Sequence, residues 1–316
     1  MTDLHVVEAR LEEAAEVLEM IHTAFGARQQ LDPPSTALAE TLTSVRAAIA
    51  DHGGLLVRVD GVAAGALLFE ADGSRLRLRR VGVDPRLQHR GVASALLGCA
   101  EEVAANQGYD TVCLTARAEL PATCEFWRRR GYVETDRDDV WITFTKAMPV
   151  EVDVPTADDA HDLGARIGRL LGGGDLVLLS GDLGAGKTTL TQGIGAGLGV
   201  RGPITSPTFV ISRVHPSLVG AAPLVHVDAY RLGGVAELDD LDLDTSLEGA
   251  VTVVEWGEGM AEPLAVDRLD VVIRRRHGDD ADEADGRRVK ITPVGARWVG
   301  VALRDAVHSV HVPGSR

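Results

Sequence analysis

A glycine-rich segment in the second half of the chain has the residue types that bind phosphate groups. Residues Gly181 to Thr188, GDLGAGKT, follow the apolar run Leu176–Ser180 and match the pattern GxxxxGK[ST] in full. Glycines let backbone N–H groups converge on phosphate oxygens, and a helix beginning near Lys187 would direct its positive end at them. Lys187, expected to face solvent and phosphate, can supply a mobile charge, and the Thr188 hydroxyl can bind Mg²⁺. The segment predicts a nucleotide-binding P-loop.

Two carboxylates follow short apolar runs further along the chain. Asp228 ends the run Leu224–Val227, and Glu255 ends the run Ala250–Val254. Ligands of open parallel sheets bind at the carboxyl ends of the strands. Either acid alone is as readily a helix cap or a surface group, but together beside a P-loop they indicate positions for a metal ion and an attacking water. Lys187, Asp228 and Glu255 are therefore the predicted catalytic residues.

Four segments occur in a characteristic order: GDLGAGKTTLTQGI, then ITSPTFVI at 204–211, HVDAYRL at 226–232 and VVEW at 253–256. In this order they resemble the motifs of the ATPase subunit of the bacterial tRNA threonylcarbamoyladenosine biosynthesis complex, the TsaE family. The resemblance covers about residues 151–300. It implies a small P-loop ATPase that hydrolyses ATP with Mg²⁺, acts with the partner subunits of that complex, and reaches tRNA through them.

The same resemblance implies roles for single residues. Thr188 and Glu255 would organise the Mg²⁺ ion, and Asp228 would assist the hydrolytic water or the metal shell. Ser206-Pro207-Thr208 would lie on a nucleotide-sensing loop. The implied ATP-binding residues are Gly181, Asp182, Leu183, Gly184, Ala185, Gly186, Lys187, Thr188, Thr189 and, from a late hairpin, Arg287.

The first half carries a second phosphate-binding pattern. Leu78–Val83 is predicted as a strand, and Gln88–Ala93, QHRGVA, follows it at the start of a predicted helix. Small residues at Gly91 and Ala93 would let backbone N–H groups approach a pyrophosphate at that helix N-terminus. The alternative is that the arginines between residues 79 and 90 form only a solvated basic face.

Together with FWRRRGY at 126–132, this pattern resembles the GCN5-related N-acetyltransferase (GNAT) superfamily, whose pattern is [RQ]xxGx[GA] after a V-x-V strand. The implied ligand is acetyl-CoA, and Val81 and Val83 would offer strand edges to its pantetheine arm. The implied acetyl-CoA-binding residues are Val81, Gly82, Val83, Gln88, His89, Arg90, Gly91, Val92, Ala93 and Ser94.

The sequence supplies no clear acid and base for acetyl transfer. Many relatives in that superfamily use a tyrosine general acid where this chain has Trp127, and an indole cannot donate a proton usefully at neutral pH. Tyr132, Tyr109 and Cys124 are substitutes that cannot be ranked, and Glu70 at a strand end is a candidate base. The acceptor amine stays open.

Hydrophobic periodicity predicts the elements that position these groups. A boundary is predicted near Pro149, which divides the chain into a GNAT-type acetyltransferase domain, residues 1–148, and a TsaE-like P-loop ATPase domain, residues 149–316. Past the boundary, Thr156 is the predicted cap of a helix whose apolar stripe runs from Leu163 to Leu171. The predicted fold class is α/β, with an N-terminal GNAT-type mixed α/β sheet domain and a C-terminal P-loop NTPase-type α/β domain.

Composition restricts the function classes. The net charge is −15, and both halves are acidic, so neither has the charge of an autonomous nucleic-acid binder. No apolar run is long enough to span a membrane, and the N-terminus lacks the pattern of a secretory signal. Three cysteines without CxxC spacing predict free thiols in a reducing, cytoplasmic location.

Two other functions fit a P-loop beside an acyl-CoA motif. One is a small-metabolite kinase, although no arginine-rich lid segment follows the P-loop. The other is a regulatory module that senses nucleotide and acyl-CoA without turnover.

Overall fold

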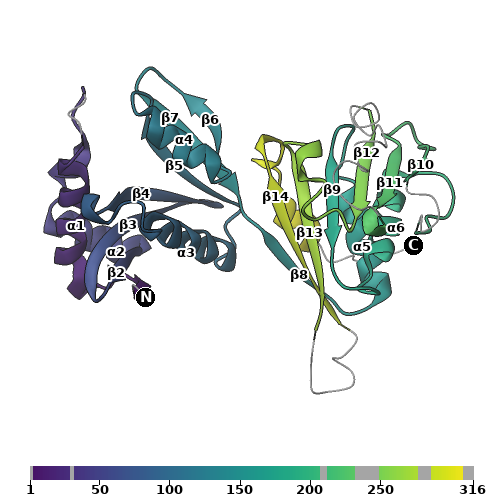
Figure 1. The fold of residues 1–316 in the computed structure, drawn as a ribbon, viewed down its shortest axis with the longest axis horizontal. Helices are drawn as coiled ribbons and strands as arrows, with labels where there is room; N and C mark the ends of the chain where they lie inside the picture. Colours follow the sequence, from purple (N-terminus) through teal and green to yellow (C-terminus); the bar gives the residue numbers. More distant parts are fainter. Residues whose placement is uncertain (1–2, 29–31, 207–211, 232–248, 277–285, 309–316) are drawn as a thin grey trace. The chain divides into compact units, whose positions relative to one another are not determined.

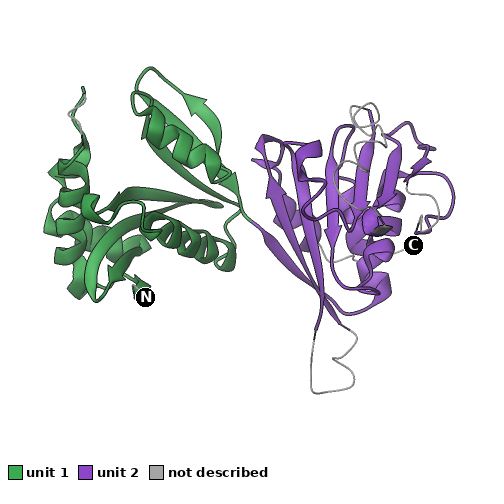
Figure 2. Ribbon diagram, in the orientation of Figure 1, with its two compact units in different colours: residues 1–148 green, residues 149–316 purple. Residues whose placement is uncertain are grey.

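The computed structural model describes residues 3–28, 32–206, 212–231, 249–276 and 286–308. Pro207 and Thr208 of the predicted nucleotide-sensing loop lie outside these ranges. The chain divides into two compact units, Met1–Met148 and Pro149–Arg316 (Figure 2). Each unit is described by itself below.

Unit 1 is a seven-stranded mixed sheet with helices on both faces (Figure 1). Its strands, in spatial order, are β1 (Leu4–Glu8), β2 (Gly54–Val59), β3 (Val62–Asp72), β4 (Arg75–Val83), β5 (Thr111–Arg117), β7 (Trp141–Ala147) and β6 (Val133–Arg137). Its α-helices are α1 (Ala14–Gly26), α2 (Leu42–His52), α3 (Val92–Asn106) and α4 (Pro121–Arg129). Short 3₁₀ turns cover Leu11–Glu13, Thr36–Ala39 and Pro85–Leu87.

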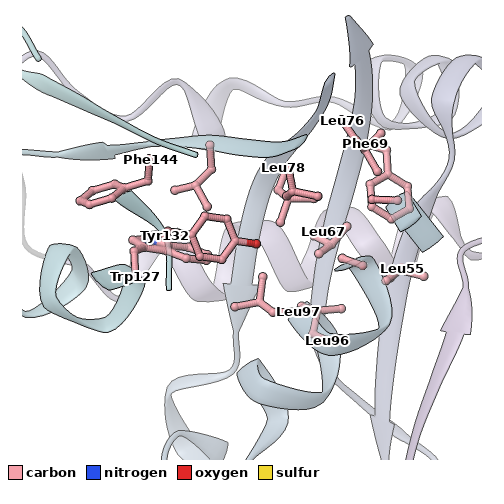
Figure 3. Packing of buried hydrophobic residues seen from close by; sticks show 14 of the residues in the cluster. Leu55, Leu67, Phe69, Leu76, Leu78, Leu96, Leu97, Trp127, Tyr132 and Phe144 are labelled. Carbon is pink, nitrogen blue, oxygen red and sulfur yellow. The ribbon is translucent and has the colours of Figure 1, made fainter. Parts of the chain in front are cut away.

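The alternation of side chains along β2 and β3 builds two cores, one on each face of the sheet. Leu55 and Leu67 belong to the core that includes residues of α3 and α4, whereas Leu56 and Leu68 belong to the core that includes residues of α1 and α2. Figure 3 shows the first of these cores, in which Trp127 lies among the aliphatic and aromatic side chains. Strands that are buried on both faces explain the nearly continuous apolar runs in this part of the sequence.

Strands β4 and β5 pair in parallel only over Arg75–Arg77 and Thr111–Cys113. Beyond that point the two strands separate (Figure 1). Strand β4 has a bulge opposite Leu67 of β3, and Arg80, within that bulge, has a φ of +55°. The edge of Val81–Val83 that faces away from β3 is therefore not hydrogen-bonded to β5.

Unit 2 is a second seven-stranded sheet. Its strands, in spatial order, are β10 (Ser212–His215), β11 (Leu224–Asp228), β12 (Val251–Glu255), β9 (Leu176–Ser180), β13 (Arg268–Arg275), β14 (Arg287–Val294) and β8 (Val150–Val154). Its α-helices are α5 (Ala157–Gly168), α6 (Lys187–Leu198) and α9 (Leu303–His308), and 3₁₀ turns cover Ala229–Arg231, Glu262–Leu264 and Ala296–Trp298. Strands β11, β12, β9 and β13 are parallel, so their carboxyl ends share one edge.

Helices α5 and α6 pack unusually closely because glycines line their contact. A Cβ added to Gly193 would lie 2.0 Å from the carbonyl oxygen of His161, and one added to Gly164 would lie 2.3 Å from that of Leu190. The glycine-rich composition of α6, which lowers its helix propensity, is thus explained by the close approach of two backbones.

Helix α5 begins as predicted, with Thr156 and Asp159 forming a reciprocal capping box. The prediction that the apolar stripe stays helical as far as Leu171 was wrong, because the helix ends at Gly168. The chain then continues in a turn, in which the backbone N–H groups of Leu170 and Leu171 donate to the carbonyls of Ile167 and Gly168, and Leu171 is still buried.

Both units are α/β, as predicted. Cys99, Cys113 and Cys124 are free thiols. Among the described residues, no helix is both long and apolar enough to cross a membrane.

Candidate functional site

The P-loop connects the end of β9 to the start of α6. Gly186 is the N-cap of α6 with a φ of +108°, and no side chain caps the helix. Gly181 has a φ of +147°, and a Cβ on it would lie 2.4 Å from the carbonyl oxygen of Ile273. Only glycine fits these two positions, and together they leave the first N–H groups of α6 without a side-chain acceptor. An uncapped helix N-terminus of this kind attracts anions.

Lys187 does not face solvent, so that prediction was wrong. The residue is 5 % exposed, and its Nζ donates hydrogen bonds to the carbonyl oxygens of Gly181 at 2.7 Å and Asp182 at 3.0 Å. The Trp256 ring lies 3.6 Å from the same nitrogen. The loop itself thus solvates the ammonium. Burial lowers the pKa of Lys187, while Glu255, Asp228 and Asp182 oppose that shift.

Asp228 and Glu255 lie side by side, because they are opposite each other in the register of β11 and β12. Asp228 is 9 % exposed and Glu255 is 2 % exposed. Asp228 accepts hydrogen bonds from the Ser206 hydroxyl at 2.9 Å and from the Tyr230 backbone N–H at 3.1 Å. Two buried carboxylates side by side favour a cation between or beside them.

The Thr188 hydroxyl lies 3.2 Å from Glu255 Oε2 and donates to it. A hydroxyl and a carboxylate oxygen are the hard ligands that Mg²⁺ accepts, so these residues fit the ion that the P-loop implies. No group of three or more His, Cys, Asp or Glu among the described residues could hold a metal by itself. Nucleotide phosphates and water would therefore complete the coordination, as is usual for Mg²⁺.

The other predicted nucleotide-binding residues lie on or near the loop. Asp182, Leu183 and Gly184 form its exposed tip, Ala185 is buried, and Thr189 lies in the first turn of α6. Arg287 begins β14, directly opposite Arg275 of β13.

Four residues that the sequence did not single out belong to this site. His226 Nε2 lies 2.9 Å from Glu255 Oε1, and Thr191 Oγ1 lies 3.3 Å from the same oxygen. Arg275 Nη2 donates to the Gly184 carbonyl at 3.2 Å. The Trp256 ring lies over the Lys187 ammonium, and the Trp256 backbone has a φ of +63°. His226 could have been found by strand alternation, because it shares a face with Asp228 two residues later. The sequence held no signal for Arg275.

Unit 1 has its own uncapped helix start. Gly91 is the N-cap of α3 with a φ of +81° and no side-chain cap, and His89 before it has a φ of +62°. The residues from Gln88 to Gly91 are exposed. Behind the helix start, the Arg130 guanidinium donates to the Ser94 hydroxyl at 3.0 Å and to the Ser94 carbonyl at 3.3 Å.

The remaining predicted acyl-CoA residues lie on both sides of this helix start. The Val92 side chain is buried in the core, and Ala93 is half-buried. Val81 and Val83 lie on the open edge of β4, with the buried Gly82 between them. Arg28 Nη2 donates to the Val81 carbonyl at 3.1 Å, a contact that the sequence did not predict.

The candidate proton donors of unit 1 are mostly in its core (Figure 3). Tyr132 and Cys124 are 1 % and 2 % exposed, and Tyr109 is half-buried. Trp127, which stands where many relatives have a tyrosine, is 5 % exposed. Burial raises the pKa of Tyr132 well above its ordinary value, and Glu101 adds to the shift. Glu70, the candidate base, is ion-paired with Arg79 at 3.0 Å.

Two family models match the chain, one in each unit. Residues 154–284 match "Threonylcarbamoyl adenosine biosynthesis protein TsaE", and residues 16–132 match "Acetyltransferase (GNAT) family".

Named relatives and solved structures align with one half of the chain or the other. The tRNA threonylcarbamoyladenosine biosynthesis protein TsaE of Streptomyces coelicolor is 64% identical over 139 residues, covering 44% of this chain and 93% of that protein. The TsaE protein of Bacillus subtilis is 43% identical over 126 residues, covering 40% of this chain and 73% of that protein.

Among solved structures, Bacillus YdiB has 29% identity and a TM-score of 0.40, covering 50% of this chain and 93% of that one. The PaiA N-acetyltransferase of Thermoplasma acidophilum with coenzyme A has 15% identity and a TM-score of 0.42, covering 46% and 99%. The first unit of this chain matches the acetyltransferase (GNAT) family model over residues 16–132. The chain belongs, through its second unit, to the TsaE family of threonylcarbamoyl adenosine biosynthesis proteins.

Proposed function

We propose that this chain binds and hydrolyses ATP with Mg²⁺ in support of tRNA threonylcarbamoyladenosine modification. The observation that carries the proposal is the convergence of Lys187, Asp228 and Glu255 at the P-loop edge of the parallel strands, all three of them buried. Three charged groups would not be buried together without a ligand that balances them, because each pays a desolvation cost.

The residues would divide the work as follows. The uncapped N–H groups of α6 and the Lys187 ammonium bind and orient the phosphates, once Lys187 leaves the carbonyls of Gly181 and Asp182. Thr188 and Glu255 hold Mg²⁺, which when bound neutralises charge on the phosphates. Asp228 is placed to orient the attacking water or the metal's water shell. Arg275 and Arg287 are candidate phosphate contacts from the hairpin.

The role in tRNA modification rests on family membership and on the names of the relatives. We infer that the chain acts with the partner subunits of that complex and contacts tRNA through them, in the cytoplasm. Both halves of the chain are acidic, which supports an indirect contact with tRNA.

Expression of the full chain in a bacterium depleted of its own ATPase subunit tests the proposal. Recovery of threonylcarbamoyladenosine in hydrolysed tRNA, measured by mass spectrometry, is expected for the wild type and not for Glu255→Ala. Purified chain should hydrolyse ATP in a partner-stimulated reaction. Turnover that requires a small metabolite would favour a kinase, and binding without turnover in any mixture would favour a sensing module.

The specific observation in favour of a second function is the open edge of β4 beside the Gly91 helix start. We propose that residues 1–148 bind acetyl-CoA and form a separate functional domain from residues 149–316. The buried Trp127 and Tyr132 cannot reach an acceptor, so acetyl transfer would be slow or restricted to one amine. Calorimetry of the chain with acetyl-CoA tests binding, and no heat at millimolar ligand would contradict it.

A further inference from the structure

His226 is a fully buried polar residue that the proposed function leaves without a role. It is 0% exposed and lies in the middle of β11, on the same face as Asp228. It cannot touch a nucleotide or an attacking water from this position. Burying an imidazole costs free energy unless the ring is hydrogen-bonded, so its one close polar contact carries weight.

That contact is Glu255 Oε1, at 2.9 Å from His226 Nε2. Since a carboxylate oxygen is an acceptor, Nε2 carries the proton and donates it. The other ring nitrogen, Nδ1, has no hydrogen-bond partner among the described residues. Within the described structure, the ring therefore has one polar task, which is to hold Glu255.

The two oxygens of Glu255 have different neighbours. Oε2 accepts from the Thr188 hydroxyl and lies on the side of the proposed metal. Oε1 faces inward, toward His226 and Thr191. Thr191 has a single hydroxyl proton and lies closer to the Lys187 carbonyl, at 3.0 Å, than to Oε1, at 3.3 Å. His226 is thus the committed donor to Oε1.

We propose that His226 is a positioning residue that orients Glu255 for Mg²⁺. This inference rests on the proposed function. By fixing Oε1 from inside the sheet, the ring presents Oε2 to the ion and to Thr188 in one rotamer. Partners that orient metal-binding side chains in this way typically contribute about 10–100-fold to metal affinity.

Two amides of different length separate a hydrogen-bonding role from a packing role. In His226→Gln the side-chain nitrogen can reach the place of Nε2, whereas in His226→Asn it reaches only the place of Nδ1, which has no partner among the described residues. Thr252→Val is the matched control, because Thr252 is also 0% exposed and its hydroxyl likewise lacks a partner among the described residues. It lies on β12, but on the opposite face from Glu255.

The experiment measures Mg²⁺-dependent binding of ADP to the full-length chain by calorimetry, and Mn²⁺ affinity by electron paramagnetic resonance, with thermal unfolding of the metal-free protein alongside. We expect His226→Asn to weaken metal affinity about tenfold or more, with His226→Gln and Thr252→Val near the wild type. ADP affinity without metal should not change. His226→Leu, which fills the ring's volume without a donor, repeats the comparison if the asparagine variant folds poorly.

Wild-type metal affinity in His226→Asn or His226→Leu would overturn the inference. A second result would also overturn it: His226→Asn and His226→Gln lose the same metal affinity, in proportion to the thermal stability that each loses. The role of His226 would then be one of packing. If the wild type bound ADP with no dependence on Mg²⁺ or Mn²⁺, the proposed function itself would fail, and this inference with it.

Discussion

The two helix starts at Gly91 and Gly186 are built alike. Each is the N-cap of an α-helix, each has a positive φ, and neither helix is capped by a side chain. Helices α2 and α5, by contrast, begin with Thr41 and Thr156, whose side chains accept from the first turn. A glycine start without a side-chain cap leaves N–H groups available for a phosphate, and each unit has one.

The two sites differ in the charged groups around the helix start. Beside Gly186, Lys187, Asp228 and Glu255 are all buried. Beside Gly91, the segment is exposed, and the candidate donors of that unit lie in its core. In the proposed functions, the site at Gly186 combines phosphate binding with buried charges that can act on a reaction, whereas the site at Gly91 binds acetyl-CoA and supports only slow or restricted acetyl transfer. If both proposals hold, a phosphate-binding helix start does not by itself indicate efficient catalysis.

Sheet topology accounts for much of this difference. Parallel strands β11, β12 and β9 bring their carboxyl ends to one edge, so residues distant in sequence meet there. In unit 1, β4 and β5 separate and leave an open strand edge in place of a cluster of side chains. That edge suits the amide groups of a pantetheine arm.

The largest effect is expected for Lys187→Ala. Loss of the ammonium should reduce ATP hydrolysis by about 10²–10³-fold or more, as for other removed transition-state contacts. Acetyl-CoA binding should be unchanged. Steady-state hydrolysis and calorimetry measure the two effects, and Lys290→Ala, an exposed lysine on β14, is the control. Near-normal ATP hydrolysis by Lys187→Ala would contradict the proposed difference between the sites at Gly186 and Gly91.

Gly91→Glu should remove acetyl-CoA binding, because it places a negative charge at the phosphate site and an L-residue at a φ of +81°. We expect a loss of at least about tenfold, since like charges at an interface cost several kcal/mol. Calorimetry is the measurement. Gly91→Ala isolates the backbone strain. Gly98→Glu adds the same charge further along α3, where a Cβ meets no atom within 4 Å. Equal losses in both glutamate variants would contradict a local site.

Gly193→Ala should destabilise unit 2, because its Cβ would meet the backbone oxygen of His161 at 2.0 Å. A cost of about 1–3 kcal/mol in the free energy of unfolding is expected from overpacking. Gly195→Ala is matched in helix propensity, but its Cβ meets the end of the Ile204 side chain, which can move. Denaturant unfolding that ranked Gly195→Ala as the more damaging change would contradict the close backbone contact.

The smallest effect is expected for Thr156→Ala, which removes the cap of α5. Loss of the capping box should cost about 1 kcal/mol of unfolding free energy and should leave nucleotide and acetyl-CoA binding unchanged. Thr41→Ala provides the same test on α2 in unit 1. A change in ligand affinity in either variant would show that capped helices also serve the sites.

Local chemistry made part of this structure predictable. The capping box at Thr156, the strand Leu176–Ser180 and the helix start at Lys187 follow from residue types within a few positions. Contacts between distant segments were less accessible. The close packing of α5 and α6 depends on glycines some thirty residues apart, so it follows from the three-dimensional arrangement of both helices and not from either segment alone.

Predictions about the P-loop site were wrong or incomplete where several elements surround one side chain. Lys187 was expected in solvent, but the carbonyls of its own loop and the Trp256 ring enclose it. Arg275 reaches Gly184 from a hairpin 91 positions away in sequence. His226 had a recognisable strand position, but its partner, Glu255, is known only from the register of β11 against β12.

The contrast between the two helix starts is tested most directly by titrating one full-length chain with both ligands. Calorimetry of the wild type should show one site for a non-hydrolysed ATP analogue, dependent on Mg²⁺, and one for acetyl-CoA, independent of Mg²⁺. Lys187→Ala should lose affinity only for the nucleotide, and Gly91→Glu only for acetyl-CoA. Two results would contradict the account of two separate ligand sites. One is nucleotide binding that depends on neither Mg²⁺ nor Lys187, and the other is a folded variant that loses both ligands.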